Sequence, residues 1–242
     1  MSIFGALRKK HPEVPFCTAV VPAAGTSTRM EGQDKTLLEL GRRPVLVLTL
    51  QALEACPLIH EIVVVTREDL VVPVSRLCRD FGLEKVSKVV TGGATRTLSV
   101  LAGIRSSDPE AALIAVHDGA RPFVTQEVLE EVIRKAAVCG AAAPAIPVTD
   151  TVKRARDGVV EETLDRETLF AVQTPQVFEA SLLKAALQKA AEDGVTLTDD
   201  CAAVERLGMQ VSLTRGDRAN LKLTTPTDLD FGLGILIGRG EA

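Results

Sequence analysis

Short runs of apolar, mostly β-branched residues alternate along the chain with amphipathic segments of helical period. The runs predict strands at residues 18–21, 61–66, 88–91, 112–117 and 142–148. The segments between them predict helices at residues 44–55, 69–81, 95–106 and 125–139, several of which begin after a Ser, Thr or Asp cap. Such alternation is typical of an open, mostly parallel, doubly wound α/β sheet with helices on both faces.

The regular alternation stops at residues 149–174, which are rich in charge and alternate polar with apolar positions. An Asp157-Gly158 turn in this segment predicts a β-hairpin arm that projects from the sheet. Beyond it we expect helices at 179–192 and 199–207, strands at 211–214 and 221–223, and a last helix that opens at Pro226. The pattern predicts one domain over residues 1–242.

Composition narrows the classes of protein that fit this pattern. The 242 residues include 46% hydrophobic residues but no Trp or Tyr, so branched aliphatic side chains must fill the core. A net charge of −4 disfavours a nucleic-acid-binding surface. The five cysteines show no C-x-x-C spacing and predict reduced, mostly buried thiols. No signal peptide or membrane anchor is apparent, and we expect a cytoplasmic protein with neither nucleic acid nor membrane as a partner.

Candidate chemistry follows the first predicted strand, where a ligand of a parallel sheet would lie. Small residues in Pro22-Ala23-Ala24-Gly25 allow backbone N–H groups to approach a phosphate, and Arg29 and Lys35 supply positive charge. This combination predicts a nucleoside triphosphate site. Neither a dinucleotide fingerprint nor a P-loop is present, and an ordinary surface turn is the alternative.

Two further strand ends carry residues that suit a metal-bound nucleotide. Asp118 ends an apolar strand and could hold a divalent cation between triphosphate oxygens, although capping of the next turn is the alternative. Its neighbour His117 points to the opposite face and is interpreted as a packed histidine. Gly92-Gly93 would let a base or ribose lie against the main chain, with Ser99 adding a hydroxyl, unless the pair is only a flexible turn.

Basic residues late in the chain have two interpretations each. Lys222 lies in a short apolar segment, where its ammonium either reaches solvent or meets an anion. Lys153, Arg154 and Arg166 lie in the predicted arm, where such charges most often form a solvated face.

Five collinear segments together resemble the 2-C-methyl-D-erythritol 4-phosphate cytidylyltransferase family. They are PAAGTSTRM at 22–30, VHDGARPF at 116–123, DTVKR at 150–154, QTPQVF at 173–178 and NLKLTTPTD at 220–228. The resemblance covers about residues 18–229. It implies a Rossmann-like nucleotidyltransferase sheet from which a hairpin arm projects.

The resemblance also implies a reaction in which methylerythritol phosphate attacks the α-phosphorus of CTP and expels pyrophosphate, with Mg²⁺ as cofactor. Arg29 and Lys35 would neutralise the charge on the transferred and leaving phosphates. Asp118 would hold Mg²⁺. The nucleotide would be bound by Asp118 together with Pro22, Ala23, Ala24, Gly25, Gly92, Ser99 and Arg121.

The second substrate is implied to bind between subunits. Thr151 and Arg166, both on the arm, match positions that bind methylerythritol phosphate in the neighbouring subunit, and Lys222 matches the lysine that aims its phosphate. A homodimer through the arm follows from this resemblance. The implied catalytic residues are Arg29, Lys35, Lys222 and Arg166.

Three positions depart from the family pattern. Ser27 stands where the family usually has glycine, Asp34 where it has proline, and Ala94 where it has an acidic or polar residue. The alternatives are a ribitol-5-phosphate cytidylyltransferase and a catalytically silent nucleotide-binding protein. Simple binding would not require all four of Arg29, Lys35, Asp118 and Lys222, and this argues against the silent binder.

Overall fold

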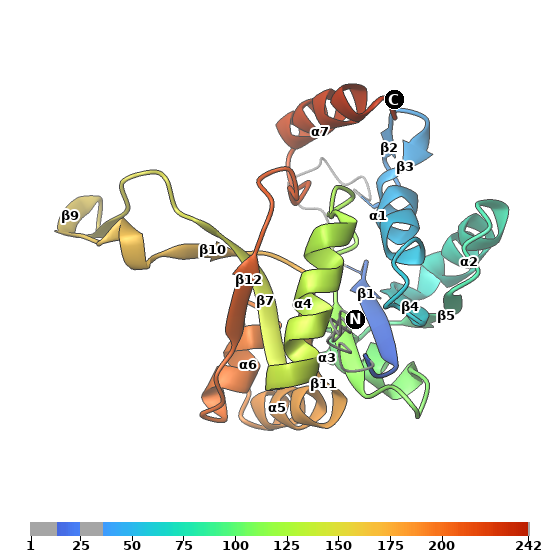
Figure 1. Ribbon diagram of the computed structural model, residues 1–242, viewed down its shortest axis with the longest axis horizontal. Coiled ribbons are helices and arrows are strands. Elements are labelled where there is room, and N and C mark those ends of the chain that lie inside the picture. The colour runs from blue at the N-terminus through green and yellow to red at the C-terminus, as the bar shows by residue number, and fades with distance from the viewer. Residues whose placement is uncertain (1–13, 25–35, 242) are drawn as a thin grey trace, which may run out of the picture.

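The computed structural model describes residues 14–24 and 36–241, and its central eight-stranded sheet confirms the doubly wound prediction (Figure 1). Seven strands follow the order β10-β7-β11-β6-β1-β4-β5, and β12 pairs with β7. Their bounds are β1 Cys17–Pro22, β4 Glu61–Thr66, β5 Val86–Thr91, β6 Leu113–Val116, β7 Ala141–Pro147, β10 Phe170–Val172, β11 Gln176–Glu179 and β12 Ser212–Arg215. Only β10 and β11 pair antiparallel with their neighbours, so the sheet is mostly parallel.

Helices cover both faces of the sheet because successive strand residues point to opposite sides. The helices are α1 Val45–Glu54, α2 Val71–Asp80, α3 Arg96–Ser106, α4 Gln126–Cys139, α5 Ala180–Glu192, α6 Asp200–Arg206 and α7 Pro226–Arg239. Ala19 and Val21 of β1 belong to a buried cluster with α1, α2 and α4. Val20 between them belongs to a second cluster with α3, α5 and α6.

The structure differs from the sequence-based assignments at three places. The expected strand at 221–223 is absent, because this segment is extended but makes no ladder and is held by a bond from Leu223 N to Ala120 O (2.8 Å). The strand β11 was not predicted, yet it lies between β6 and β7 in the sheet. The first turn of the helix expected at 69–81 is a 3₁₀ helix, Glu68–Leu70, followed by α2.

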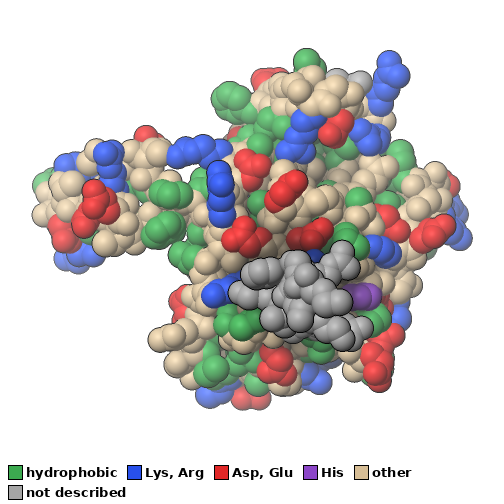
Figure 2. Space-filling model, in the orientation of Figure 1, with side chains coloured by type: hydrophobic (Ala, Val, Ile, Leu, Met, Phe, Trp, Pro, Cys, Tyr) green, Lys and Arg blue, Asp and Glu red, His purple; other side chains and the backbone are tan. Residues whose placement is uncertain are grey.

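The hairpin arm is confirmed and projects from the sheet at the left of Figures 1 and 2. Its strands β8 (Lys153–Arg156) and β9 (Val159–Thr163) meet at Asp157-Gly158, whose φ angles of +50° and +80° suit the predicted tight turn. A 3₁₀ turn, Arg166–Thr168, leads back toward the body. The predicted bounds 149–174 extend too far at the return end, because β10 already pairs with β7 of the central sheet.

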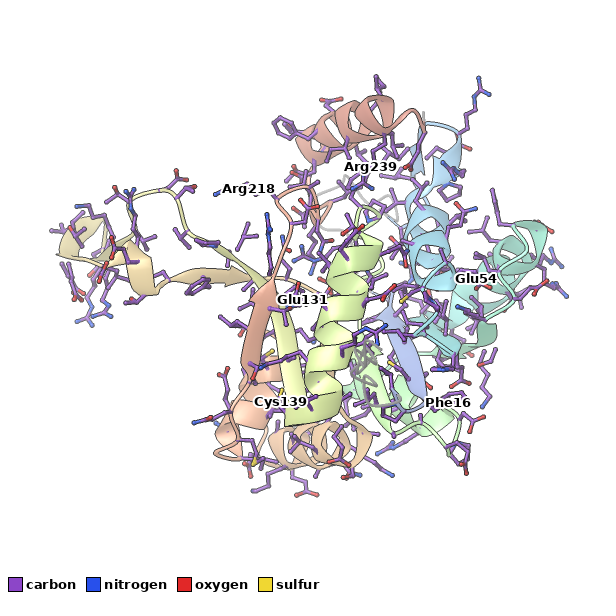
Figure 3. All side chains as sticks on the ribbon, viewed as in Figure 1. Phe16, Glu54, Glu131, Cys139, Arg218 and Arg239 are labelled. Carbon is purple, nitrogen blue, oxygen red and sulfur yellow. The ribbon has the colours of Figure 1, made fainter. Side chains whose placement is uncertain are left out.

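A third buried cluster fixes the segment that carries Lys222. Leu223, fully buried, packs there with Phe123, Leu40 and Leu236 of α7. Arg239, labelled in Figure 3, donates from α7 to Phe123 O (3.1 Å). A small β2–β3 hairpin (Glu39–Leu40, Arg43–Pro44) borders the same region.

All five cysteines are free, and four of them are buried, as expected; Cys139, labelled in Figure 3, is the exposed one. Among the residues that the structure describes, no helix is long and apolar enough to cross a membrane.

Candidate active site

A cavity of about 480 Å³ opens at the carboxyl ends of β1, β4, β5 and β6. Seven of the predicted site residues line it, namely Pro22, Ala23, Ala24, Gly92, Ser99, Asp118 and Lys222. A parallel sheet gathers strand ends at one edge, which is why these distant segments meet. The volume is suited to a nucleotide-sized ligand.

Close backbone approach makes glycine necessary at one point of the cavity wall. A Cβ on Gly92 would lie 2.7 Å from Ser99 Oγ and 3.3 Å from the Ala24 Cβ. The Ser99 hydroxyl accepts from Gly93 N (3.1 Å) and donates to Thr95 O (2.9 Å), so it braces the loop that the glycines form. A side chain at position 92 would therefore displace the Ser99 hydroxyl and disturb the loop that it braces.

Thr66, at the end of β4, also lines the cavity and was not predicted as a site residue. Its buried hydroxyl oxygen has no hydrogen-bond partner among the described residues. A buried hydroxyl is ordinarily satisfied, so this group is available to a ligand or a water molecule.

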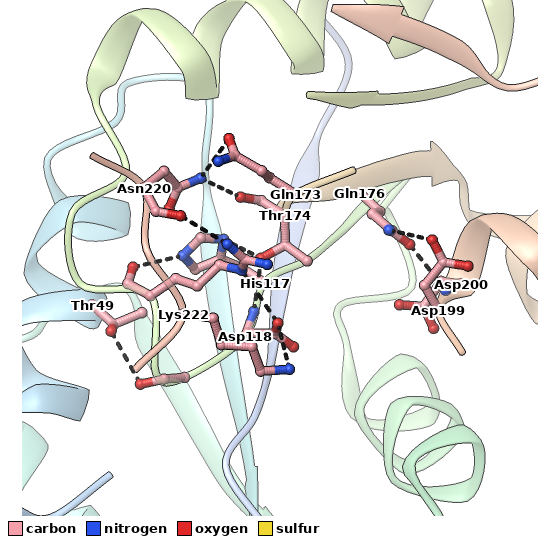
Figure 4. A network of polar contacts seen from close by, with 12 residues as sticks. Thr49, His117, Asp118, Gln173, Thr174, Gln176, Asp199, Asp200, Asn220 and Lys222 are labelled. Carbon is pink, nitrogen blue, oxygen red and sulfur yellow. Dashed lines mark hydrogen bonds and ion pairs between the residues drawn. The ribbon is translucent and has the colours of Figure 1, made fainter. Parts of the chain in front are cut away.

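Asp118 forms ion pairs with three cations, of which Lys222 is labelled in Figure 4. Its Oδ2 lies 3.0 Å from Lys222 Nζ and 3.3 Å from Arg121 Nε, and its Oδ1 lies 4.0 Å from an Arg96 nitrogen. Burial alone would raise the pKa of Asp118, but Lys222, Arg96 and Arg121 outweigh it and lower the pKa to about 2. The carboxylate is therefore ionised throughout the physiological pH range.

The donor set fits a magnesium ion that is held mainly by its nucleotide. No group of three or more His, Cys, Asp or Glu side chains that could hold a metal occurs in residues 14–24 and 36–241. Magnesium commonly binds one or two carboxylates together with substrate phosphates and water. Asp118, ionised and facing the cavity, suits this mode, whereas an ion held by protein groups alone would find too few ligands.

His117 is packed, as the sequence interpretation expected. The side chain is fully buried, Nε2 lies 3.1 Å from Arg121 O, and Nδ1 lies 3.0 Å from Thr174 Oγ1. Since Arg121 O can only accept, Nε2 carries the proton, and Nδ1 accepts from the threonine hydroxyl. That hydroxyl in turn accepts from Asp118 N (3.1 Å), so His117 positions the backbone of Asp118.

Burial of His117 should make the stability of the protein depend on pH. Desolvation lowers the pKa of His117 from 6.5 to about 4, so the unfolded chain binds an extra proton between these values. The free energy of unfolding should fall by about 3 kcal/mol from this group as pH drops from 6.5 to 4. Urea unfolding across this range measures the slope.

The variant His117→Gln should flatten that slope whatever its absolute stability. An equal slope in wild type and His117→Gln would contradict the assignment.

Other buried polar residues hold the segment around Lys222 against the sheet (Figure 4). The Asn220 amide donates to Thr174 O (2.9 Å), and Gln173 Nε2 donates to Asp217 O (2.7 Å). Arg121 ties this segment to Asp118, because its guanidinium also donates to Asn220 O (2.8 Å). Sequence analysis gave these polar residues no role of their own, although Gln173, Thr174 and Asn220 belong to two of the segments that carry the family resemblance.

Arg96 and Asp200 form a further ion pair at the cavity floor that was not predicted. The guanidinium donates to both carboxylate oxygens, at 2.9 and 2.6 Å, and Asp200 is fully buried. Burial lowers the pKa of Arg96, but the Asp200 carboxylate more than offsets this and the net shift is upward. Burial raises the pKa of Asp200, and the charge and hydrogen bonds of Arg96 oppose this rise. Both carboxylate oxygens accept from the guanidinium, which is the geometry of an ionised pair, so we treat both groups as charged.

The arm residues and the cavity residues are separate within one chain. Thr151 and Arg166 are exposed on the arm, where Arg166 donates to Thr149 O (2.9 Å). Neither lines the cavity that contains Asp118 and Lys222. Gly25, Arg29 and Lys35, together with the departures Ser27 and Asp34, lie outside the described residues.

Comparison with known proteins finds similar proteins over most of the chain. Residues 17–236 match the family model described as 2-C-methyl-D-erythritol 4-phosphate cytidylyltransferase. The chain is 43% identical over 219 residues to the protein of that name from Bacillus velezensis, covering 90% of this chain and 94% of the relative. It is 41% identical to the one from Halalkalibacterium halodurans, with 90% and 96% covered.

Solved structures agree with this similarity. The 4-diphosphocytidyl-2C-methyl-D-erythritol synthase from Anaerococcus prevotii superimposes with a TM-score of 0.83 at 30% identity, covering 92% of this chain and 96% of that one. The 2-C-methyl-D-erythritol 4-phosphate cytidylyltransferase from Thermus thermophilus gives 0.75 at 31% identity, with 90% and 98% covered.

Proposed function

The chain belongs to the 2-C-methyl-D-erythritol 4-phosphate cytidylyltransferase family, and on that premise we propose that it transfers the cytidylyl group of CTP to 2-C-methyl-D-erythritol 4-phosphate. A phosphate oxygen of the sugar alcohol forms a bond to the α-phosphorus of CTP. The bond from that phosphorus to the bridging oxygen of the β-phosphate breaks, and pyrophosphate leaves. The product is 4-diphosphocytidyl-2-C-methyl-D-erythritol, an intermediate of non-mevalonate isoprenoid synthesis.

The observation that carries this proposal is the junction of Lys222 with Asp118 at the mouth of a nucleotide-sized cavity. The nucleophile is already an anion, so the enzyme needs no general base and must chiefly hold two anions in line. Ala23, Ala24 and Gly92 line the part of the cavity where close backbone approach suits a base and ribose. The Lys222 ammonium pairs with Asp118, and because 40% of its side chain is exposed it can also meet the second substrate's phosphate.

The metal site and the phosphate-binding cations complete the proposal. Asp118 would hold Mg²⁺, which when bound to the triphosphate neutralises the charge that develops on the leaving pyrophosphate. Arg29 and Lys35, in the segment after β1, would stabilise the same charge, and one such contact is worth about a hundredfold or more in rate. Arg121 supports the site through Asp118 rather than by facing the cavity.

A homodimer through the arm is part of the same proposal. Arg166 and Thr151 would bind methylerythritol phosphate in the partner's cleft, because their own chain places them away from the cavity. Three apolar side chains on the arm and its return strand are exposed in the single chain and would be covered by a partner subunit. They are Val159, Val160 and Phe170, at 69%, 56% and 47% exposed.

One assay tests the substrate assignment. The protein is incubated with Mg²⁺ and each of CTP, UTP and ATP, paired with methylerythritol phosphate or ribitol 5-phosphate, and pyrophosphate is measured. We expect release only with CTP and methylerythritol phosphate. Release only with ribitol phosphate would favour a ribitol-5-phosphate enzyme, and no release from folded dimer would favour a silent binder. A cytoplasmic location is proposed with this function, because its substrates are small phosphorylated metabolites.

A further inference from the structure

We propose that Asp200 is an electrostatic positioning residue, whose carboxylate neutralises Arg96 so that a divalent cation can bind Asp118 beside it. The inference rests on the proposed role of Asp118 as the metal-binding carboxylate. It assigns a function to a buried ion pair that the transfer reaction itself does not use.

The two oxygens of Asp118 have different surroundings. Oδ2 is shared by Lys222 at 3.0 Å and Arg121 at 3.3 Å, whereas the ion-pair partner of Oδ1 in the described residues is Arg96 at 4.0 Å. Oδ1 is therefore the oxygen left for a cation, and the Arg96 guanidinium lies 4.0 Å from it. An uncompensated guanidinium at that distance would repel a divalent ion.

Asp200 supplies the compensating charge from inside the protein. It has no exposed surface and binds Arg96 through both oxygens, while the Arg96 side chain remains 33% exposed at the cavity. Among the groups in ion-pair contact, three cations (Lys222, Arg121 and Arg96) meet two carboxylates (Asp118 and Asp200), and loss of Asp200 would leave one. Asp199 acts on Arg96 from farther away, without an ion-pair contact. The charge of Asp200 thus changes the balance between cation and anion binding in the cleft.

The position of Asp200 is fixed by contacts on its far side. Gln176 of β11 accepts from Asp200 N (2.9 Å) and Cys201 N (3.1 Å), and its amide donates to Asp199 Oδ2 (2.8 Å), as Figure 4 shows. These bonds anchor the first turn of α6 to the centre of the sheet. Asp200, fixed in this way, holds the Arg96 guanidinium beside Asp118.

The test compares cation and anion binding in Asp200→Asn. Mn²⁺ binding in the presence of CTP is measured by electron paramagnetic resonance, and binding of CTP without metal is measured by calorimetry in EDTA. We expect Mn²⁺ affinity to fall about tenfold while affinity for metal-free CTP stays equal or rises severalfold. Asp193→Asn removes an exposed aspartate that also pairs with an arginine, and this control should change neither value.

A purely structural role for Asp200 would weaken both binding constants together, and that result would overturn the inference. The double variant Arg96→Gln/Asp200→Asn restores the charge balance and should return Mn²⁺ affinity to within about threefold of wild type. If Asp200→Asn does not fold, Arg96→Gln is measured in its place. This variant should bind Mn²⁺ at least as tightly as wild type, and weaker binding would overturn the inference. Failure of the wild type to bind Mn²⁺ with CTP would instead remove the proposed role of Asp118.

Discussion

Replacement of Asp118 by asparagine should lower kcat by about a hundredfold or more with CTP and methylerythritol phosphate. The substitution keeps the size of the side chain and removes the carboxylate that Lys222, Arg121 and Arg96 share. Lys222 and Arg121 then lose their common partner, and the proposed metal loses its protein ligand. Steady-state kinetics over a range of Mg²⁺ concentrations measure the loss.

The metal dependence separates this effect from simple damage to the fold. Asp118→Asn should need a much higher Mg²⁺ concentration for its residual activity, whereas Asp193→Asn, the exposed-aspartate control, should keep the wild-type requirement. Because Asp118 is buried and pairs with three cations, its loss should also lower stability, so the assays are run below the unfolding temperature of the variant. Activity near the wild-type level with an unchanged Mg²⁺ requirement would contradict the role assigned to Asp118.

Mixing two inactive variants should restore activity if the sites form between subunits. Lys222→Ala removes the cleft lysine, and Arg166→Ala removes the arm arginine, so each homodimer lacks one group in every site. In a heterodimer, one site would combine both defects and the other would be intact. Random assortment then gives about a quarter of wild-type activity.

Coexpression with two different affinity tags isolates the heterodimer, which should show about half of wild-type activity because one of its two sites is intact. Should Lys222 and Arg166 act within one chain, every site would carry one defect and no activity would return. A useful control mixes Lys222→Ala with Asp118→Asn, which both lie in the cleft, and should restore no activity because each cleft of the mixed dimer carries one of the two defects. The pair Arg166→Ala with Thr151→Ala tests the arm in the same way.

The sequence predicted most strands and helices because their apolar periodicity is local. It missed β11 because that strand has four residues, follows a proline, and gains its partners from β6 and β7 far away in the chain. The segment 221–223 shows the converse error: its apolar residues alternate as in a strand, but they pack under α7 instead of forming a ladder. Burial, rather than sheet pairing, produced that pattern.

The candidate site was only partly predictable for a similar reason. Strand ends indicated Asp118 and Gly92, because the topology of a parallel sheet brings such positions together. Nothing local pairs Arg96 with Asp200, which lie far apart in sequence, and their contact depends on how β11 anchors α6. A charged pair assembled by tertiary packing leaves no periodic signal.

The position of β11 between β6 and β7 limits when the sheet can form during synthesis on the ribosome. Strand β6 ends at Val116, but the neighbour that covers its free side begins only at Gln176. Until that stretch is synthesised, β6 presents an open edge, and β7 cannot be joined to it. We expect truncated chains that stop within the arm to be prone to aggregation, whereas chains that extend past Glu179 can close the gap.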